Sequence, residues 1–149
     1  MKRGLSSPGP PSHGLIATAG PGLLLALLLT WSGAAEAHHS IAGMYDEGHP
    51  ITIDGVVSEF HFVNPHPFVL LQVKDTGGRD QVWKLELDNR WELVDAGMSA
   101  TTLKAGDRLT VTGGPAYKQA NAIYVRRMQR GDGFLYEQVG FSPKVSGLR

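Results

Sequence analysis

The chain has 149 residues, no cysteine, and 14 basic against 14 acidic side chains, so its formal net charge is zero. This length suits one ordinary domain. The lack of cysteine excludes disulfides, thiolate metal sites and a lipid-modified N-terminal cysteine. The balanced charge argues against general nucleic-acid binding. We therefore expect one small domain without a nucleic-acid partner.

Residues 1–37 are typical of a secretory signal peptide. Lys2 and Arg3 give a positive start, residues 23–31 ("LLLALLLTW") form an apolar core, and an Ala-Glu-Ala triplet ends at Ala37. The apolar core is shorter than the roughly 20 residues that span a bilayer, although an uncleaved anchor stays open as an alternative. We expect cleavage after Ala37, a periplasmic or secreted protein, and no membrane contact of the mature chain.

The mature chain is predicted to begin with a polar, turn-rich segment, residues 38–50, that lies across the surface of the domain. Runs of β-branched and alternating apolar residues then predict strands. The five predicted strands span residues 51–63, 68–74, 81–87, 108–113 and 121–129. Gly55 inside the first strand indicates a bulge or a sharp bend. The C-terminal tail, residues 131–149, is only weakly patterned.

One helix is predicted, over residues 89–98, between the third and fourth strands. Asn89 suits the N-cap, and Glu92 follows three residues later as in a capping box. Gly97 suits the end of the helix. The apolar residues expected on its buried side are Trp91, Leu93, Val94 and Met98.

Three strands, one short helix and two strands follow one another in the order of an OB-fold, a small five-stranded Greek-key barrel. A bent first strand fits this fold, because that strand serves both halves of the barrel. We therefore predict an all-β domain with one short helix, an OB-fold-like barrel over residues 51–130. Another small β-barrel or a β-sandwich is the main alternative.

Two adjacent histidines follow the expected cleavage site. Cleavage after Ala37 makes His38 the first residue, so its free amine and its imidazole can chelate one ion, and His39 adds a second ring. Nitrogen ligands suit Cu(II), and imidazoles also suit zinc or nickel. The plainer interpretation of the pair is a flexible polar terminus that binds no metal.

The Asn-Pro-His-Pro sequence of residues 64–67 predicts a rigid loop between the first two strands. In an OB-fold this loop opens toward the ligand-binding face, and a polar side chain held in place suits a binding site. His66 is therefore a further candidate metal ligand and His61 a reserve, with Asn64 orienting the loop and Ser40 supporting the terminal histidines. The alternative is a structural loop in which His66 hydrogen-bonds a carbonyl group.

Enzymatic chemistry finds little support in the sequence. The chain has no cysteine, no G-x-S-x-G motif and no glycine-rich phosphate loop. Glu86 and Asp88 are spaced to share one side of a strand, but a paired-carboxylate site would need partners that the sequence does not indicate. A binding protein is thus favoured over an enzyme.

The motifs "AHHSIAGMYD", "VNPHPF", "VWKLEL" and "LKAGDRLTVTG" together resemble a group of small exported bacterial proteins of unknown function. The resemblance extends from Ala37 to about Gly133 and implies an exported OB-like barrel without an established activity. The positions that match the group's pattern are His38, His39, Ser40, Asn64, Pro65, His66, Trp83, Glu86, Gly106 and Asp107. Residues 89–91 (Asn-Arg-Trp) depart from it, because small residues are common there in the group.

The sequence therefore predicts an exported protein that binds a transition metal, copper foremost and zinc or nickel as alternatives. Its ligands would be His38, His39 and His66, with His61 in reserve. A metal-free OB-type module that binds an exported enzyme or a small ligand is the alternative. A copper monooxygenase with an N-terminal histidine chelate is the least favoured hypothesis, since no broad aromatic substrate surface is evident.

Overall fold

The computed structural model describes residues 38–140 and 142–148, and the side chains from residue 41 onward. The predicted signal peptide, residues 1–37, lies outside the described residues. The described helices and strands are α2 (His38–Met44), β1 (Ile51–His61), β2 (Phe68–Lys74), β3 (Asp80–Glu86), α3 (Arg90–Asp95), β4 (Arg108–Pro115), β5 (Ala122–Arg130), β6 (Leu135–Val139) and β7 (Ser142–Ser146). None of the described helices is long and apolar enough to cross a membrane.

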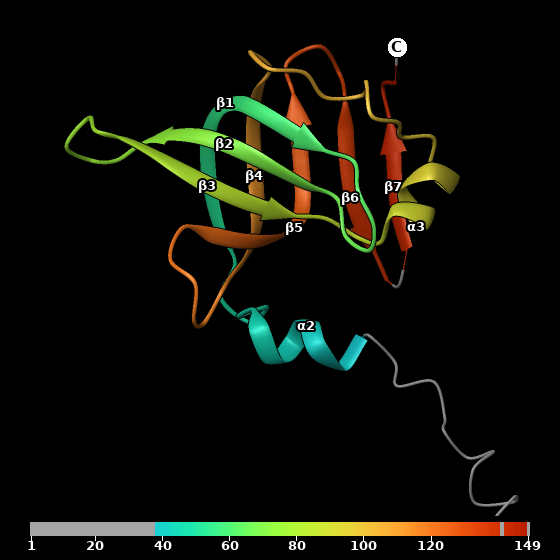
Figure 1. Ribbon diagram of the computed structural model, residues 1–149, viewed down its shortest axis with the longest axis horizontal. Helices are drawn as coiled ribbons and strands as arrows, with labels where there is room; N and C mark the ends of the chain where they lie inside the picture. Colours follow the sequence, from blue (N-terminus) through green and yellow to red (C-terminus); the bar gives the residue numbers. More distant parts are fainter. Residues whose placement is uncertain (1–37, 141, 149) are drawn as a thin grey trace, which may run out of the picture. The chain divides into compact units, whose positions relative to one another are not determined.

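The strands form one sheet in the order β3-β2-β1-β4-β5-β6-β7, and a parallel pairing of β3 with β5 closes the first five strands into a barrel (Figure 1). All other strand pairs in the sheet are antiparallel. The order of strands and the position of α3 confirm the predicted OB-fold-like Greek-key barrel.

Strand β1 belongs to both halves of the barrel, as its internal glycine predicted. Residues 51–56 pair with β4, residues 56–61 pair with β2, and the register shifts after Val57. A Cβ atom on Gly55 would lie 2.5 Å from the carbonyl oxygen of Gln72. Only glycine lets the two backbones approach this closely at the bend.

Helix α3 begins and ends where its capping residues predict. The side chain of Asn89 accepts a hydrogen bond from the Glu92 N–H at 3.0 Å. At the other end Gly97 has φ +91°, and the N–H groups of Gly97 and Met98 bond back to the carbonyls of Val94 and Leu93. This is the Schellman pattern of helix termination. The helix spans Arg90–Asp95 and is shorter than the predicted range 89–98, but Asn89 and Gly97 cap it as predicted.

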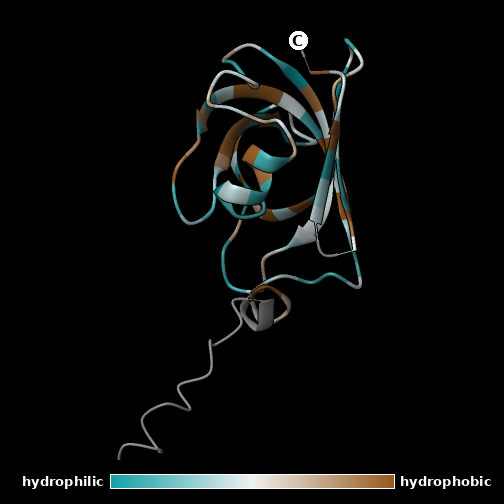
Figure 2. Ribbon diagram, turned by 90° about the vertical axis from the view of Figure 1, so that its right-hand side faces the viewer, coloured by the Kyte–Doolittle hydropathy of each residue, from teal (hydrophilic) through white to brown (hydrophobic). Residues whose placement is uncertain are grey.

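The predicted buried side of α3 is only half right. Leu93 and Met98 are buried in the core, whereas Trp91 is 68 % exposed and Val94 42 % exposed. Figure 2 shows α3 at one end of the barrel. A helix of six residues presents so little surface to the barrel end that Leu93 alone of its residues is buried, and Trp91 points to solvent.

The core lies inside the barrel and continues under the C-terminal strands. Leu85 and Leu87 face inward while Val82 is exposed, which confirms the predicted alternation in β3. Val63, expected within the first strand, lies beyond the end of β1 and is 46 % exposed. The fully or nearly fully buried apolar residues include Val57, Val69, Leu71, Leu85, Leu87, Leu93, Val111, Ile123, Val125, Met128, Phe134 and Tyr136.

Two segments hold more regular structure than their sequences predict. Residues 38–44 form α2 instead of turns. The weakly patterned tail adds β6 and β7, which extend the sheet beyond β5. These strands have five residues each, and Pro143 lies in β7 at the edge of the sheet, where a missing N–H is tolerated. Such short strands leave little periodic signal.

Candidate functional site

The His66 loop is tied to the end of β3 by three hydrogen bonds. The Arg90 N–H donates to the Pro65 carbonyl at 3.0 Å, and the Leu87 N–H donates to the Pro67 carbonyl at 3.0 Å. Pro67 has no N–H, so it cannot donate the second hydrogen bond of this strand pair, and the carbonyl of Leu87 is left without a backbone donor. The Nδ1 atom of His66 lies 3.2 Å from that carbonyl and supplies the missing bond.

This hydrogen bond decides which nitrogen of His66 carries the proton. A carbonyl oxygen only accepts, so Nδ1 donates and the lone pair of neutral His66 is on Nε2. No described residue bonds Nε2. The structural alternative for this loop, a histidine bonded to a carbonyl, is therefore present. This hydrogen bond leaves Nε2 of His66 free, which is the arrangement typical of histidine metal ligands.

The strand register places Phe68 and Glu86 on the outer face of the barrel, next to the His66 loop. Phe68 pairs with Glu86, and the Leu87–Pro67 bond extends the ladder by one position. Pro67 and Leu87 are buried, so Phe68 and Glu86, their neighbours in the chain, lie on the opposite, outward side. We call the surface formed by His61, His66, Phe68 and Glu86 the outer face.

His61 belongs to the outer face through its pairing with Phe68. The two rings stack with centroids 4.4 Å apart and an angle of 11°. The Nε2 atom of His61 lies 2.7 Å from a carboxylate oxygen of Glu59, an oxygen that only accepts, so Nε2 donates this bond when His61 is neutral. The Nδ1 atom of His61 makes no hydrogen bond with a described residue.

Tyr45 attaches the N-terminal segment to the same end of β3. Its hydroxyl donates to Glu86 Oε2 at 2.8 Å, and its ring lies 5.7 Å from that of Tyr124. Burial, followed by the neighbouring Glu86 carboxylate, raises the pKa of Tyr45, so the hydroxyl keeps its proton. Because Glu86 precedes Leu87, the attachments of Tyr45 and His66 are on consecutive residues.

Backbone contacts hold residues 44–47 in place. We call this segment, which contains Tyr45, the strap. The Asp46 N–H donates to the Pro115 carbonyl at 2.8 Å, and the Tyr117 N–H donates to the Met44 carbonyl at 2.9 Å. A single β-bridge pairs Tyr45 with Ala116. The predicted surface segment is therefore held on the β4–β5 connection.

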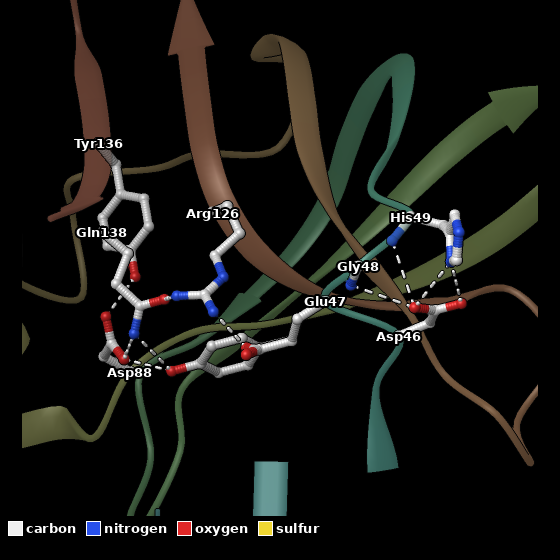
Figure 3. A network of polar contacts seen from close by, with 9 residues as sticks. Asp46, Glu47, Gly48, His49, Asp88, Arg126, Tyr136 and Gln138 are labelled. Atoms are coloured by element: carbon white, nitrogen blue, oxygen red, sulfur yellow. Dashed lines mark hydrogen bonds and ion pairs between the residues drawn. The ribbon is translucent and has the colours of Figure 1, made fainter. Parts of the chain in front are cut away.

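A buried polar network lies next to the strap (Figure 3). Asp88 is only 3 % exposed and accepts hydrogen bonds from Tyr136 at 2.7 Å, from Gln138 at 2.8 Å and from Tyr124. Arg126 donates to both Gln138 and Glu47, so it links the network to the strap. Burial, followed by the Asp88 charge, raises the pKa of Tyr124 and Tyr136.

Sequence reasoning did not find this network. Glu86 and Asp88 share one side of the chain, as their spacing predicted, but each takes different partners. Asp88 is saturated and buried, so the two carboxylates do not form a paired catalytic site. The one signal in the sequence is the spacing of Tyr136 and Gln138, which lie two residues apart in the tail segment that forms β6.

The L-K-x-G-D motif is structural. Gly106 has φ +92°, and its N–H donates to the Val57 carbonyl at 2.9 Å. Asp107 accepts from the Lys104 N–H at 2.9 Å and from Arg130 at 2.6 Å. Arg130 also contacts Asp132 and the Thr102 carbonyl. These contacts close the turn against the β5–β6 connection.

Other expected site residues fall outside these contacts. The side chains of His38, His39 and Ser40 lie outside those the structure describes. Asn64 is exposed and its peptide bond to Pro65 is cis. Among the side chains that the structure describes, no group of three His, Cys, Asp or Glu residues is placed to hold a metal ion.

The comparisons decide the family. DUF6152, a family of unknown function, matches residues 26–123. The chain belongs to this family. The match covers α2, the strap, the outer face and most of the barrel, and it ends within β5. No curated protein and no solved structure matches the chain.

Proposed function

We propose that this DUF6152 protein is exported and binds a divalent transition metal ion, copper foremost, through its mature N-terminus and His66. The ligands would be the amine and ring of His38, the ring of His39 and Nε2 of His66, with His61 in reserve. Zinc and nickel are the alternative ions for such nitrogen ligands. Asn64 and Ser40 would support the loop and the terminus.

One observation carries this proposal: the strap and the His66 loop are attached to consecutive residues of one strand end. Tyr45 bonds Glu86 and His66 bonds Leu87. His38 precedes Tyr45 by seven positions, which is about 10 Å of helix or at most about 24 Å of extended chain. The short chain between His38 and Tyr45 thus limits how far a terminus at His38 can lie from the strand end that His66 bonds.

The chemistry of His66 supports the same proposal. Its Nδ1–H is committed to a backbone carbonyl, which fixes the orientation of the ring. Prolines on both sides and the bonds to Arg90 and Leu87 restrict the loop. The nitrogen is thus held in place before any ion binds, which lowers the entropic cost of binding.

The test begins with the exported protein carrying its own N-terminus. Mass determination is expected to show a chain that starts at His38. Cu(II) titration with paramagnetic resonance should then show coupling to several nitrogens. His38→Ala and His66→Ala should each weaken binding and remove part of that coupling.

A matched control is available on the same segment. The side chain of His49 is 88 % exposed and, among the described residues, contacts Asp46 alone, so His49→Ala should leave affinity and spectrum unchanged. If the mature chain begins elsewhere, or if the wild-type protein binds Cu(II) no better than the His38→Ala variant, the proposal is wrong.

A second candidate function is a metal-free accessory module that docks on an exported protein. The observation that favours it is the exposure of Trp91 beside Val94 at the barrel end, because tryptophan is enriched at binding hot spots. Crosslinking in periplasmic extract, with wild type and Trp91→Ala compared, tests this function. A partner lost from the variant supports it, and identical crosslinks in both oppose it.

A further inference from the structure

We infer that Glu86 is a carboxylate ligand of the same ion, an inference that rests on the proposed metal-binding function. Glu86 pairs with Phe68, two residues after His66, and it directly precedes Leu87, whose carbonyl His66 bonds. Two such side chains can converge on one ion.

The hydrogen bonds of Glu86 leave one oxygen available. Oε2 accepts from the Tyr45 hydroxyl at 2.8 Å, and Lys84 Nζ lies 3.8 Å from the same oxygen, beyond hydrogen-bond distance. Oε1 has no hydrogen bond or ion pair with any described residue. Carboxylates that bind metal ions are commonly hydrogen-bonded through their other atoms, and Tyr45 provides that bond here.

A comparison with Asp88 shows why the inference falls on Glu86. Both oxygens of Asp88 accept hydrogen bonds, and the side chain is buried under Tyr124 and Tyr136. Glu86 keeps a side-chain exposure of 15 % and faces outward. Of these two carboxylates, Glu86 alone has an oxygen without a described partner and a direct hydrogen bond to the strap.

Tyr45 then has a positioning role. Its hydroxyl orients the Glu86 carboxylate, and its backbone holds the chain that leads to His38. Loss of the hydroxyl frees both the carboxylate and, in part, the strap. Tyr45→Phe should therefore weaken metal binding without removing any ligand.

The ligand set narrows the class of ion. Imidazole and amine nitrogens with one carboxylate oxygen suit Cu(II), Ni(II) or Zn(II), whereas Cu(I) prefers sulfur ligands. None of the proposed ligands is a sulfur atom. We therefore expect selectivity for the oxidised copper ion over Cu(I).

The experiment measures Cu(II) alone on the full mature chain with its native N-terminus. Glu86→Gln keeps an oxygen that can accept from Tyr45, so the fold should survive, and metal-free circular dichroism checks this. Cu(II) affinity should fall about tenfold or more, in the range seen when groups that support a metal are lost. The nitrogen coupling should remain, while the copper hyperfine splitting changes.

Two further variants separate ligation from other effects. Glu137→Gln removes an exposed carboxylate on β6 that pairs with Arg127 on β5, and it should behave as wild type. Glu86→Asp keeps the negative charge, but its shorter side chain moves the carboxylate oxygen away from the ion, so its copper spectrum should also change. A wild-type spectrum in Glu86→Asp would overturn ligation by Glu86.

The outcomes distinguish this inference from the proposed function. If the wild-type protein binds no Cu(II), the proposed function fails. If it binds Cu(II) and loses affinity in His66→Ala, but Glu86→Gln matches Glu137→Gln, only the assignment of Glu86 is wrong. If affinity falls in both His66→Ala and Glu86→Gln, the assignment stands.

Discussion

The backbone of Asp46 lies directly over Gly114: a Cβ atom at residue 114 would be 2.8 Å from the Asp46 carbonyl oxygen. This close approach lets the strap hydrogen-bond to Pro115 and places Tyr45 against Tyr124. The second glycine of the "TGG" sequence in β4 is therefore a requirement of the N-terminal segment.

Gly114→Ala should loosen the strap more than the barrel. The new methyl group forces the Asp46 backbone outward, and overpacking of this kind costs about 1–3 kcal/mol. Hydrogen exchange should show faster exchange at the Asp46 N–H with protection kept at β1 and β4. Gly131→Ala is the control, because no heavy atom lies within 4 Å of its added Cβ. Equal exchange in the two variants would contradict the role of Gly114.

Asp88→Asn should lower the free energy of unfolding by about 2–4 kcal/mol. The substitution replaces one acceptor oxygen by a donor that faces hydroxyl and amide donors, and a buried mismatch of this kind is costly. Urea denaturation measures the change. Asp80→Asn is the matched control: it is exposed and pairs only with Lys74, so its effect should stay below about 1 kcal/mol.

Stability should fall steeply at alkaline pH. The pKa values of Tyr45, Tyr124 and Tyr136 are raised in the folded protein, whereas unfolded tyrosine titrates near about 10. The folded chain therefore holds more protons above pH ~10. Each such tyrosine stabilises the fold fully below that pH, and its contribution falls by about 1.4 kcal/mol per pH unit above it.

Urea denaturation between pH 8 and 11 measures this dependence. Tyr136→Phe should be less stable than wild type at pH 8, because Asp88 loses a donor, and should show a shallower decline above pH ~10. Tyr117 is exposed, so Tyr117→Phe should reproduce the wild-type decline. A slope that is the same in all three proteins would contradict the protonated network.

The two apolar residues of α3 should differ sharply in their effect on stability. Leu93 is completely buried, so Leu93→Ala should cost about 2–5 kcal/mol. Trp91 is mostly exposed, so Trp91→Ala should change the free energy of unfolding by no more than about 0.5 kcal/mol. Thermal and urea unfolding measure both. A larger cost for Trp91 would mean that it packs in solution.

Local patterns predict most of the barrel because they act over a few residues. Alternation assigns the two faces of β3, Asn89 and Gly97 mark the ends of α3, and Gly55 marks the bend in β1. Each signal depends on one strand or one turn. The order of these elements then leaves the OB-fold as the natural arrangement.

The same reasoning failed where burial depends on distant partners. Trp91 has an apolar side chain on a helix, yet the barrel end accommodates only Leu93. The tail has weak periodicity, yet Tyr136 is buried and its hydroxyl donates a hydrogen bond to Asp88, 48 residues earlier. Sequence patterns carry no information on which residues meet across such separations.

The sequence by itself predicted five barrel strands and one helix in their order along the chain, the caps of that helix, the candidate ligand His66 and a free terminus at His38. Only the tertiary structure decided that Tyr45 and His66 attach to consecutive residues at the end of β3, that Nδ1 of His66 replaces the N–H that Pro67 lacks, and that Asp88 is saturated while Glu86 is not. The physical reason is that a ligand set is a property of side chains that converge in space. Such convergence depends on strand register and burial, which no stretch of the chain contains alone.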